Sequence, residues 1–527
     1  MIDTQLISSF TFKGLLLGFV ALSCAAAAFC VHRVFFHPLA KYPGPWLAKI
    51  SNLYSGYHAW RGDLHLDMWK CHEKYGDFVR YGPNSLLVNT AAGLQDVYGH
   101  GKNFKKAQRY FAMVHRAPNT LTVIDKTKHG KKRRVISQGF SDAALKGHEL
   151  VILEQIKHLC TQLKAGKSNQ ATPTGTWSTP KNMGRMTDYF AFDVMSNIIF
   201  NIPWSTLRSP TYRFVPEVIE KSNVRVGTLA QSPEITIFRL DKYLFPEAIR
   251  ARDIFIKFVD EMLTQGIEAA AKTGKGVFAI LANAKDPETG LALRNRELGG
   301  ESATLIVAGT DTTSTAMAAC FFYLAHNQAA LDRATAEVRA TFSSPSEIRM
   351  GAQMHSCTFL RACIDESMRL SPSAASSLWR EAESPGATVD GQYIPPGVDV
   401  GTCIYSIHHN PAYYPDPFSF RPERWIPSEC GAVSKDADVG AARSAFNPFS
   451  IGPRSCIGKS LAYVELHLAL ANVLWSFDMR VAKGNLGRIG EGNAGNEYGR
   501  HRVDEYQLYD HLTAAKEGPY LEFRPRV

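Results

Sequence analysis

The sequence lacks most of the features that mark a secreted or a zinc-binding protein. Its 527 residues include only 10 cysteines, which form no Cys-x-x-Cys pair and show no regular spacing. No Asn-x-Ser/Thr glycosylation acceptor is present either. These absences exclude a zinc site of paired cysteines and a disulfide framework, and they indicate reducing, cytosolic surroundings for most of the chain.

Charge of one sign is never concentrated in long runs. The net charge is +10, from 59 Lys and Arg against 49 Asp and Glu, but the densest basic run, at residues 131–134, is only four residues long. No recognition-helix or zinc-finger pattern accompanies the basic residues, so nucleic acid is not expected as a partner. We interpret most of the positive charge as a solvated basic surface.

One long uncharged run lies near the N-terminus, from Gly14 to Val31. As a helix it would be about 27 Å long, enough to cross the hydrocarbon core of a bilayer. A cleaved signal peptide is the alternative, because residues 25–28 are small, but the basic residues Arg33 and Lys41 follow the run and few precede it. We therefore expect a luminal N-terminus at 1–13, a transmembrane anchor at 14–31, a basic, Pro-rich hinge at 32–46 and one globular domain at 47–527.

The rest of the chain is predicted to be mainly α-helical with a smaller β contribution. Apolar recurrence without proline predicts helices, whereas polar or alternating stretches predict loops and short strands. The stretch Glu301–His326 is apolar almost all round, which indicates a helix buried through the middle of a single domain. The predicted helices are Asp63–Tyr75, Asp188–Phe200, Ala251–Ala270, Glu301–His326, Gln328–Thr341 and Ile457–Trp475; strands are predicted at Ser85–Asn89, within Thr388–Val400 and in the C-terminal tail; Ala165–Pro180 is predicted as a polar loop and His409–Trp425 as a Pro- and aromatic-rich meander.

A cysteine loop at residues 449–458 carries the strongest chemical signal. It reads Phe-Ser-Ile-Gly-Pro-Arg-Ser-Cys-Ile-Gly, in which Gly452 permits a tight turn and Cys456 lies just before a helix start, where free N–H groups stabilise a thiolate. Gly458 lets a flat ligand approach the helix, and Arg454 offers a cation to a ligand carboxylate. The alternative is an inert, buried cysteine at a loop–helix junction.

This loop resembles the cysteine-ligand loop of the cytochrome P450 family, Phe-x-x-Gly-x-Arg-x-Cys-x-Gly, at every fixed position. Glu366 and Arg369 resemble its Glu-x-x-Arg helix motif, and residues 420–425, which contain Arg424, resemble its Pro-Glu-Arg segment. The resemblance extends from the anchor to the C-terminus and is nearest to fungal membrane-bound (microsomal) members. It implies a cytochrome P450-like catalytic domain with haem b bound through Cys456, Phe449 beside the haem, and a structural cluster of Glu366, Arg369 and Arg424.

A polar patch interrupts the long apolar helix at residues 308–313. A buried carboxylate and mid-helix threonines break local rules, which is typical of functional sites, although a satisfied polar patch or a helix kink is the alternative. The resemblance implies an oxygen-binding groove here, in which Gly309 opens space above the iron. It further implies that Thr312 hydrogen-bonds dioxygen and that Asp311 relays protons from solvent.

Cationic residues that would hold the haem propionates come from three segments. The resemblance implies this role for Arg454, for Arg380, and for His129 with Arg133, although His129 stands where the family more often has Trp. Three further basic residues of the same predicted helix, Lys131, Lys132 and Arg134, fit either a reductase-facing surface or a solvated helix face.

By the same resemblance the substrate pocket is lined by residues 104–121, 305–312 and 373–378. The last stretch is rich in small residues, which predicts a roomy site for a polycyclic or terpenoid-sized apolar substrate. The lining residues predicted from these stretches are Phe104, Leu121, Leu305, Ala308, Ala375 and Ser376.

The source of electrons is predicted to be another protein. Residues 490–495 fit Gly-x-Gly-x-x-Gly but lie in a polar tract without the strand and helix of a dinucleotide site, so we interpret them as a surface loop. The resemblance implies a membrane-bound NADPH-dependent cytochrome reductase, with cytochrome b5 as a second candidate partner.

The predicted function is a monooxygenase that inserts one oxygen atom from O2 into an apolar secondary metabolite. It would sit in the endoplasmic reticulum membrane, single-pass, with its catalytic domain in the cytosol. Two alternatives remain open: a haem-thiolate isomerase, dehydratase or peroxygenase that needs no reductase, and a non-catalytic haem-binding sensor.

Overall fold

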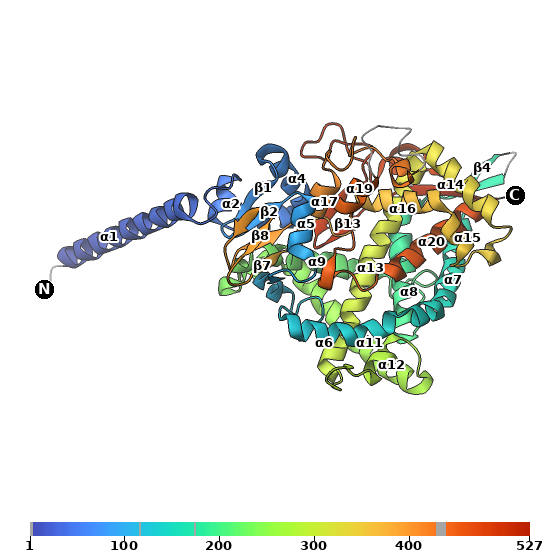
Figure 1. The fold of residues 1–527 in the computed structure, drawn as a ribbon, viewed down its shortest axis with the longest axis horizontal. Helices are drawn as coiled ribbons and strands as arrows, with labels where there is room; N and C mark the ends of the chain where they lie inside the picture. Colours follow the sequence, from blue (N-terminus) through green and yellow to red (C-terminus); the bar gives the residue numbers. More distant parts are fainter. Residues whose placement is uncertain (1–3, 115–116, 173–174, 428–438, 527) are drawn as a thin grey trace.

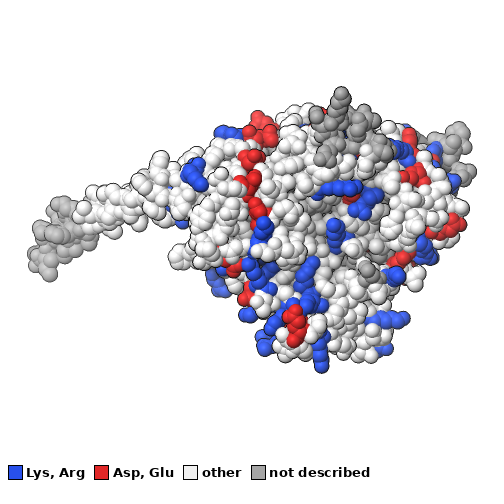
Figure 2. Space-filling view, viewed as in Figure 1, with Lys and Arg blue, Asp and Glu red and all other residues white. Residues whose placement is uncertain are grey.

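The N-terminal helix projects from the body of the protein as a separate arm (Figure 1). The computed structural model describes residues 4–114, 117–172, 175–427 and 439–526. Helix α1 (Thr4–Val31) continues into a π-helical turn, His32–Phe36. The segment Gly14–Phe36 is long and apolar enough to span a membrane and is not buried. The side chains described on this arm, from Gly14 on, carry no charge until close to the body (Figure 2). Residues 296–326 pass the same test of length and composition but are mostly buried, as a core helix would be.

The joint between arm and body is non-helical over residues 37–45, before α2 (Trp46–Ile50) begins. Arg80 fixes it from the first β-sheet. The backbone N–H of Arg80 donates to the carbonyl of Pro43 at 2.7 Å, and its guanidinium donates to the carbonyl of Arg33 at 2.8 Å. The prolines and this buried arginine together hold the arm at a defined place on the domain.

A five-stranded sheet lies next to the joint. Its strand order is β1-β2-β10-β7-β3, with β10 parallel to β2 and the other neighbours antiparallel. The strands predicted around residues 85 and 388–400 belong to this sheet and to the hairpin beside it. The bounds are β1 Phe78–Gly82, β2 Ser85–Val88, β3 Phe104–Lys106, β7 Arg380–Ala382 and β10 Asp399–Gly401, with the hairpin of β8 Ala387–Val389 and β9 Gln392–Ile394.

Helices make up most of the body, and every predicted helix is present. The differences lie at the ends: the central helix α13 starts at Asn295, where Arg294 and Glu297 form its cap, rather than at Glu301. The α-helices after α2 are α3 Leu53–Arg61, α4 Leu64–Tyr75, α5 Ala91–Tyr98, α6 Lys126–Ser137, α7 Asp142–Lys164, α8 Met183–Phe200, α9 Phe214–Gln231, α10 Leu240–Leu244, α11 Pro246–Thr273, α12 Val277–Asn283, α13 Asn295–His326, α14 Gln328–Thr341, α15 Ala352–Ser356, α16 Thr358–Leu370, α17 Ile404–His408, α19 Val439–Ala445 and α20 Lys459–Ser476.

Helix α13 runs through the middle of the body, as its all-round apolarity predicts (Figure 1). It shares the main hydrophobic core with α8, α16 and α20, where Phe192, Phe321, Leu360 and Leu466 are fully buried. Burial on this scale is the main source of stability for a domain of this size. The core therefore fixes the helix on which the predicted oxygen-side residues stand.

The prediction of a polar loop at Ala165–Pro180 is wrong, because the structure has a hairpin there. Strands β4 (Lys167–Thr172) and β5 (Gly175–Ser178) pair antiparallel. Trp177 anchors the hairpin: it is buried, with the guanidinium of Arg480 4.1 Å from its ring centroid. Threonine and tryptophan favour strands, and this preference outweighs the polar composition on which the loop prediction rested.

Short strands end the chain, as predicted. β11 (Phe477–Val481), β14 (Tyr520–Pro525) and β6 (Lys181–Asn182) form one sheet, and β12 (Leu508–His511) and β13 (Thr513–Lys516) form a hairpin that reaches back to α9 and α13. Residues 490–495 form turns and open no helix, so they do not make a dinucleotide-binding motif.

Candidate active site

The cysteine loop folds as a tight turn in front of α20. The N–H of Cys456 donates to the carbonyl of Phe449 at 2.8 Å and closes the loop. Gly452 adopts φ 69°, and a Cβ there would clash with the carbonyl oxygen of Tyr98. Only glycine suits this position, since it needs both a left-handed backbone and a close approach to α5.

The Cys456 side chain is accessible to solvent although it is surrounded by protein. Burial raises the pKa of its thiol, whereas the N–H groups of Gly458 and Lys459 and the charge of Arg133 lower it. These are the helix-start donors that the sequence predicts. The other described cysteines outside α1 are buried or half-buried, so Cys456 is the cysteine of the body that a ligand can reach.

Five basic side chains gather beside this loop. Arg133 donates to the carbonyl of Ser455 at 2.7 Å, and Arg454 donates to the carbonyls of Val123 and Ile124 at 2.6 and 2.9 Å. They are joined by three further side chains, all buried: His129 on α6, Arg380 on β7 and Lys106 on β3.

The electrostatics of this basic cluster favour the binding of an anion. Burial, then Arg454, Arg133 and other members, lower the pKa of His129 to about 3; burial and Arg380 lower that of Arg454 to about 10, and burial lowers that of Lys106 strongly. Within the described residues none of the five forms an ion pair with a carboxylate. A haem fits this site, because its two propionates supply the negative charge and a single thiolate supplies the metal ligand.

The predicted structural cluster forms as expected. Arg369 makes two hydrogen bonds of 2.9 Å to the Glu366 carboxylate, and Arg424 makes a third of 2.9 Å. Burial alone would raise the pKa of Glu366, but the two guanidinium groups lower it to about 2. Arg369 also donates to the carbonyls of His408 and Pro417, so the cluster ties α16 to the meander that precedes the cysteine loop.

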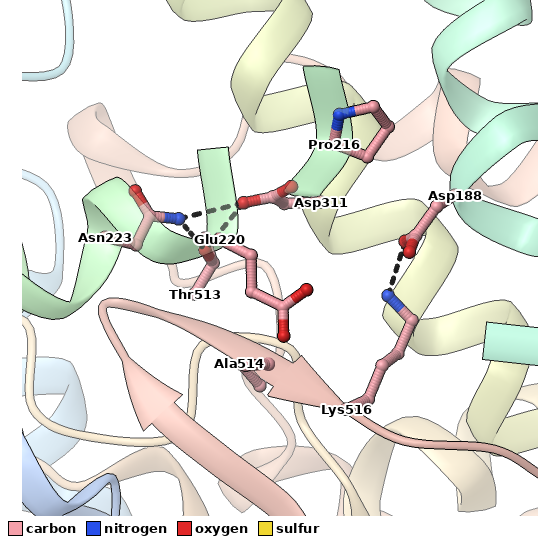
Figure 3. Close-up of a pocket in the computed structure, with 9 residues that line it drawn as sticks. Asp188, Pro216, Glu220, Asn223, Asp311, Thr513, Ala514 and Lys516 are labelled. Atoms are coloured by element: carbon pink, nitrogen blue, oxygen red, sulfur yellow. Dashed lines mark hydrogen bonds and ion pairs between the residues drawn. The ribbon is translucent and has the colours of Figure 1, made fainter. Parts of the chain in front are cut away.

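Asp311 points away from the helix axis into a small polar cavity (Figure 3). Its Oδ2 accepts hydrogen bonds from Asn223 of α9 and Thr513 of β13, each 2.9 Å long. Thr312 is the next residue, and its hydroxyl donates to the carbonyl of Ala308 at 2.6 Å. Ala308 is exposed and Leu305 half-buried on the same helix.

The cavity beside Asp311 contains more charges. Lys516 pairs with Asp188 at 2.6 Å, and Glu220 extends between this pair and Asp311 (Figure 3). Burial raises the pKa of Asp311 to about 7, although the ammonium of Lys516 opposes the shift. The group can therefore hold or release a proton near neutral pH, as a proton relay requires.

Gly309 lies where α13 packs against α8. A Cβ at Gly309 would lie 2.5 Å from Sδ and Cε of Met195 on α8. The missing side chain thus allows α8 and α13 to pack closely, and methionine fills the space where a Cβ would stand.

The predicted pocket residues separate into two groups. Phe104 is buried in the core of the five-stranded sheet, and Ala375, 1% exposed, is buried in a second core with Trp379. Both side chains therefore belong to packed cores of the described structure. Ser376 and its neighbour Ala374 do line a cavity, together with Met113 and Leu378. Leu121 is exposed, and its carbonyl accepts a hydrogen bond from Lys106.

The basic side chains of α6 do not form one reductase-facing surface. Lys132 is buried and pairs with Glu297 at 2.8 Å and with Glu301 at 3.3 Å. Arg134 pairs with Asp286 at 2.8 Å. Both tie α6 to neighbouring segments, which leaves Lys131 for a solvent-facing role.

Several residues of the site escaped the sequence reasoning, among them Lys106, Asn223 and Thr513. No motif contains them. Lys106 reaches the cluster because β3 pairs with β7 and places it opposite Arg380. The strand Phe104–Lys106 is one apolar residue followed by two lysines, so its sequence gives no signal that Lys106 is buried.

Comparison with known proteins agrees with this geometry. The sequence model of the Cytochrome P450 family matches residues 41–492. The chain is 54% identical to the cytochrome P450 monooxygenase atnE of Emericella nidulans, with 95% of each chain covered. It is 47% identical to the cytochrome P450 monooxygenase AKT7 of Alternaria alternata, over 94% of this chain and 95% of the relative. It is 45% identical to poxM of Penicillium oxalicum, over 94% and 91%.

Proposed function

The chain belongs to the cytochrome P450 family of monooxygenases, and we propose that it oxidises an apolar secondary metabolite of polycyclic or terpenoid type with electrons from a separate NADPH-dependent reductase. One observation supports this most strongly. A reachable thiol, Cys456, adjoins a buried basic cluster that has no carboxylate partner among the described residues.

In this proposal the chain holds haem b at two places. Cys456 provides the thiolate ligand, and Arg454, Arg380, Arg133 and His129 bind the propionates, with Lys106 as an additional cation. When bound, the haem supplies the activation of O2, which the electron-rich thiolate promotes.

Asp311 and Thr312 would hold and transfer protons for the reaction. Asn223 and Thr513 hold one carboxylate oxygen of Asp311, and the polar cavity behind it leads toward Glu220 and Lys516. The Thr312 hydroxyl donates to the Ala308 carbonyl, and rotation about its side-chain bond would redirect that donor. The pair can therefore pass a proton inward while the surrounding helix excludes bulk water.

The proposed membrane anchor determines where in the cell the reaction would take place. Residues 14–31 would cross the endoplasmic reticulum membrane once, and the basic residues that follow would keep the catalytic domain in the cytosol. A reductase in the same membrane, and cytochrome b5 as a second donor, would then reach the domain. Of the two alternatives, an isomerase or peroxygenase has no need of the buried acid Asp311, and a sensor has no need of the acid and the substrate cavity together.

Spectroscopy and metabolite analysis test the proposal. The carbon monoxide complex of the reduced full-length protein should show the red-shifted Soret band of thiolate ligation, and Cys456→Ala should abolish it. A histidine-type spectrum would contradict the proposal. Co-expression with a fungal NADPH-dependent reductase should yield a host metabolite one oxygen atom heavier, and this product should require NADPH and the reductase. Product formation with peroxide alone would favour the peroxygenase alternative.

A further inference from the structure

Another buried carboxylate, Asp510, lies on the C-terminal hairpin, three residues before Thr513. It stands near the end of β12, and its backbone N–H donates to the carbonyl of Gly62 at 2.9 Å. The residue is 1% exposed, and neither oxygen of its side chain has a hydrogen-bond partner among the described residues. Nδ1 of His65, at 4.0 Å, is too distant for a hydrogen bond and is itself without a partner there.

Asp510 lines the cavity that also contains Ala374 and Ser376. Most of the wall is apolar and includes Leu64, Met113, Leu378 and Leu512. Two segments of this wall, around residues 113 and 374–378, belong to the stretches that the sequence predicts as substrate-lining. The proposal therefore treats this cavity as a continuation of the proposed substrate site.

Arg109 and Gln231 of this cavity already have hydrogen-bond partners, whereas the Ser377 hydroxyl, like Asp510, has none among the described residues. Arg109 donates two hydrogen bonds to Asp399, of 3.0 and 2.8 Å. The indole N–H of Trp379 donates to Gln231 at 3.1 Å. Asp510 differs from these residues in being a carboxylate whose two oxygens have no partner in hydrogen-bonding geometry among the described residues.

The charge around Asp510 favours a neutral ligand group over a cationic one. Burial raises the pKa of Asp510 to about 6, while the dipoles of Ser376 and of the Leu512 N–H, which lie near it outside hydrogen-bonding geometry, and the charge of Arg500 act against the rise. With Arg500 nearby, the local charge is already balanced. An ammonium group would add an unmatched charge, whereas a hydroxyl would donate a hydrogen bond to the carboxylate without adding charge.

We propose that Asp510 is a substrate-anchoring residue, which accepts a hydrogen bond from a hydroxyl group at one end of a polycyclic apolar substrate. This inference rests on the proposed function, since it names the substrate class of the same site. A buried acceptor without a partner is costly, and a ligand that supplies a donor removes that cost. Such a site discriminates strongly against an analogue that lacks the donor.

Binding of three matched probes to the haem-loaded, full-length protein tests the proposal. The probes are androstan-3-ol, its methyl ether and androstane, which share one skeleton and differ in the donor. Calorimetry and the spin-state change of the haem spectrum give the dissociation constants. We expect the alcohol to bind about tenfold or more tightly than the ether, as for a hydrogen bond to a charged acceptor.

Two variants and a control assign the preference to Asp510. Asp510→Leu should reduce the preference for the alcohol to within about twofold, because no acceptor remains. Asp510→Asn, which keeps the shape of the side chain, should reduce the preference for the alcohol over the ether. If the leucine variant does not fold, the asparagine variant provides the test. Asp504→Asn, which changes an exposed carboxylate just before β12, should leave this preference unchanged.

The outcomes separate this inference from the proposed function. A normal thiolate-type carbon monoxide band with equal binding of alcohol and ether, or with no binding of any probe, overturns the anchoring role alone. Loss of the preference in the Asp504 control also overturns it. Absence of the thiolate-type band in the wild-type protein would instead overturn the proposed function.

Discussion

Nδ2 of Asn223 lies 2.9 Å from Oδ2 of Asp311, so a hydrogen bond from helix α9 holds the carboxylate in the middle of helix α13. Thr513 donates to the same oxygen from the C-terminal hairpin. Three segments that are distant in sequence thus meet at one carboxylate. Burial raises the pKa of this carboxyl, and the Thr513 hydroxyl acts against the rise.

Removal of the Thr513 donor should raise the pKa of Asp311 further above its present value of about 7. The hydroxyl stabilises the charged form, so Thr513→Val makes proton loss harder, and the carboxyl stays protonated to higher pH. Infrared difference spectra across a pH titration measure the pKa of Asp311, and the Asp311→Asn variant assigns the carboxyl band. Thr236, exposed on the surface, provides the matched control as Thr236→Val. A titration that Thr513→Val leaves unmoved would contradict the prediction.

Lys106→Met should weaken the hold on haem. In the proposed holoprotein the buried ammonium neutralises a propionate, and a hydrogen bond between charged groups of this kind corresponds to about tenfold or more in affinity. We expect haem transfer to apomyoglobin to be faster by about that factor. Lys105→Met is the matched control, since Lys105 pairs with Glu381 outside the basic cluster. Equal rates of haem transfer from both variants would contradict the assignment of Lys106 to the haem site.

Glu366→Gln should destabilise the protein at pH 7 by about 3–5 kcal/mol, because two buried arginines lose their partner. The pKa of Glu366 is lowered to about 2 in the folded state, against about 4.3 in an unfolded chain. Its contribution is therefore full above about pH 4.3 and is lost as the pH falls toward 2. Urea denaturation at several pH values should show the difference between wild type and variant shrinking in that window.

The exposed pair of Glu217 and Lys221 supplies the control for this measurement. Glu217→Gln should change the free energy of unfolding by less than about 1 kcal/mol, as for surface ion pairs in general. A Glu366→Gln variant as stable as this control would show that the cluster does not lock the meander.

Much of the fold follows from the sequence because local patterns determine it. Helices α4, α14 and α20 begin and end within two residues of their predicted bounds, since caps and apolar periodicity lie within each segment. The cysteine loop could also be recognised in the sequence, because all the residues of its motif lie within one short segment. Its partner Arg424 lies on a different segment and came from the family resemblance alone.

The remaining site residues could not be predicted because strand pairing and helix packing bring them together. Phe104 and Ala375 lie in segments too short to show an alternation of apolar and polar residues. The sequence therefore could not show that their side chains are buried in the core. Lys106 and Thr513 reach their sites only through the registers of β3 with β7 and of β12 with β13. Gly309 was assigned to ligand space because its helix neighbour Met195 could not be seen in the sequence.

Adjacent alanines should respond oppositely to enlargement. Ala375→Phe should overpack a closed core and cost about 1–3 kcal/mol in stability. Ala374→Phe should fill the cavity of Asp510 instead, with weaker binding of androstan-3-ol and little change in the unfolding midpoint. Denaturation curves and spectral titrations on both variants distinguish the two. Weaker binding in the folded Ala375→Phe protein, at unchanged stability, would place that side chain in the pocket after all.

A double-mutant cycle tests whether Gly309 serves helix packing. Gly309→Ala forces its Cβ against Met195, which must shift, and should cost about 1–3 kcal/mol. Met195→Ala alone should cost about 2–5 kcal/mol through the cavity it leaves. The double variant should be less destabilised than the sum, because the new methyl group occupies part of that space.

Gly300→Ala on the same helix is the control, since a Cβ there has no contact closer than 3.9 Å. It should leave stability unchanged or raise it by up to about 1 kcal/mol, because alanine is the better helix former. If Gly309 instead opened space above the haem, Gly309→Ala would slow carbon monoxide binding without a loss of stability. Met195→Ala would then not offset the effect of Gly309→Ala, because the two residues would not compete for the same volume.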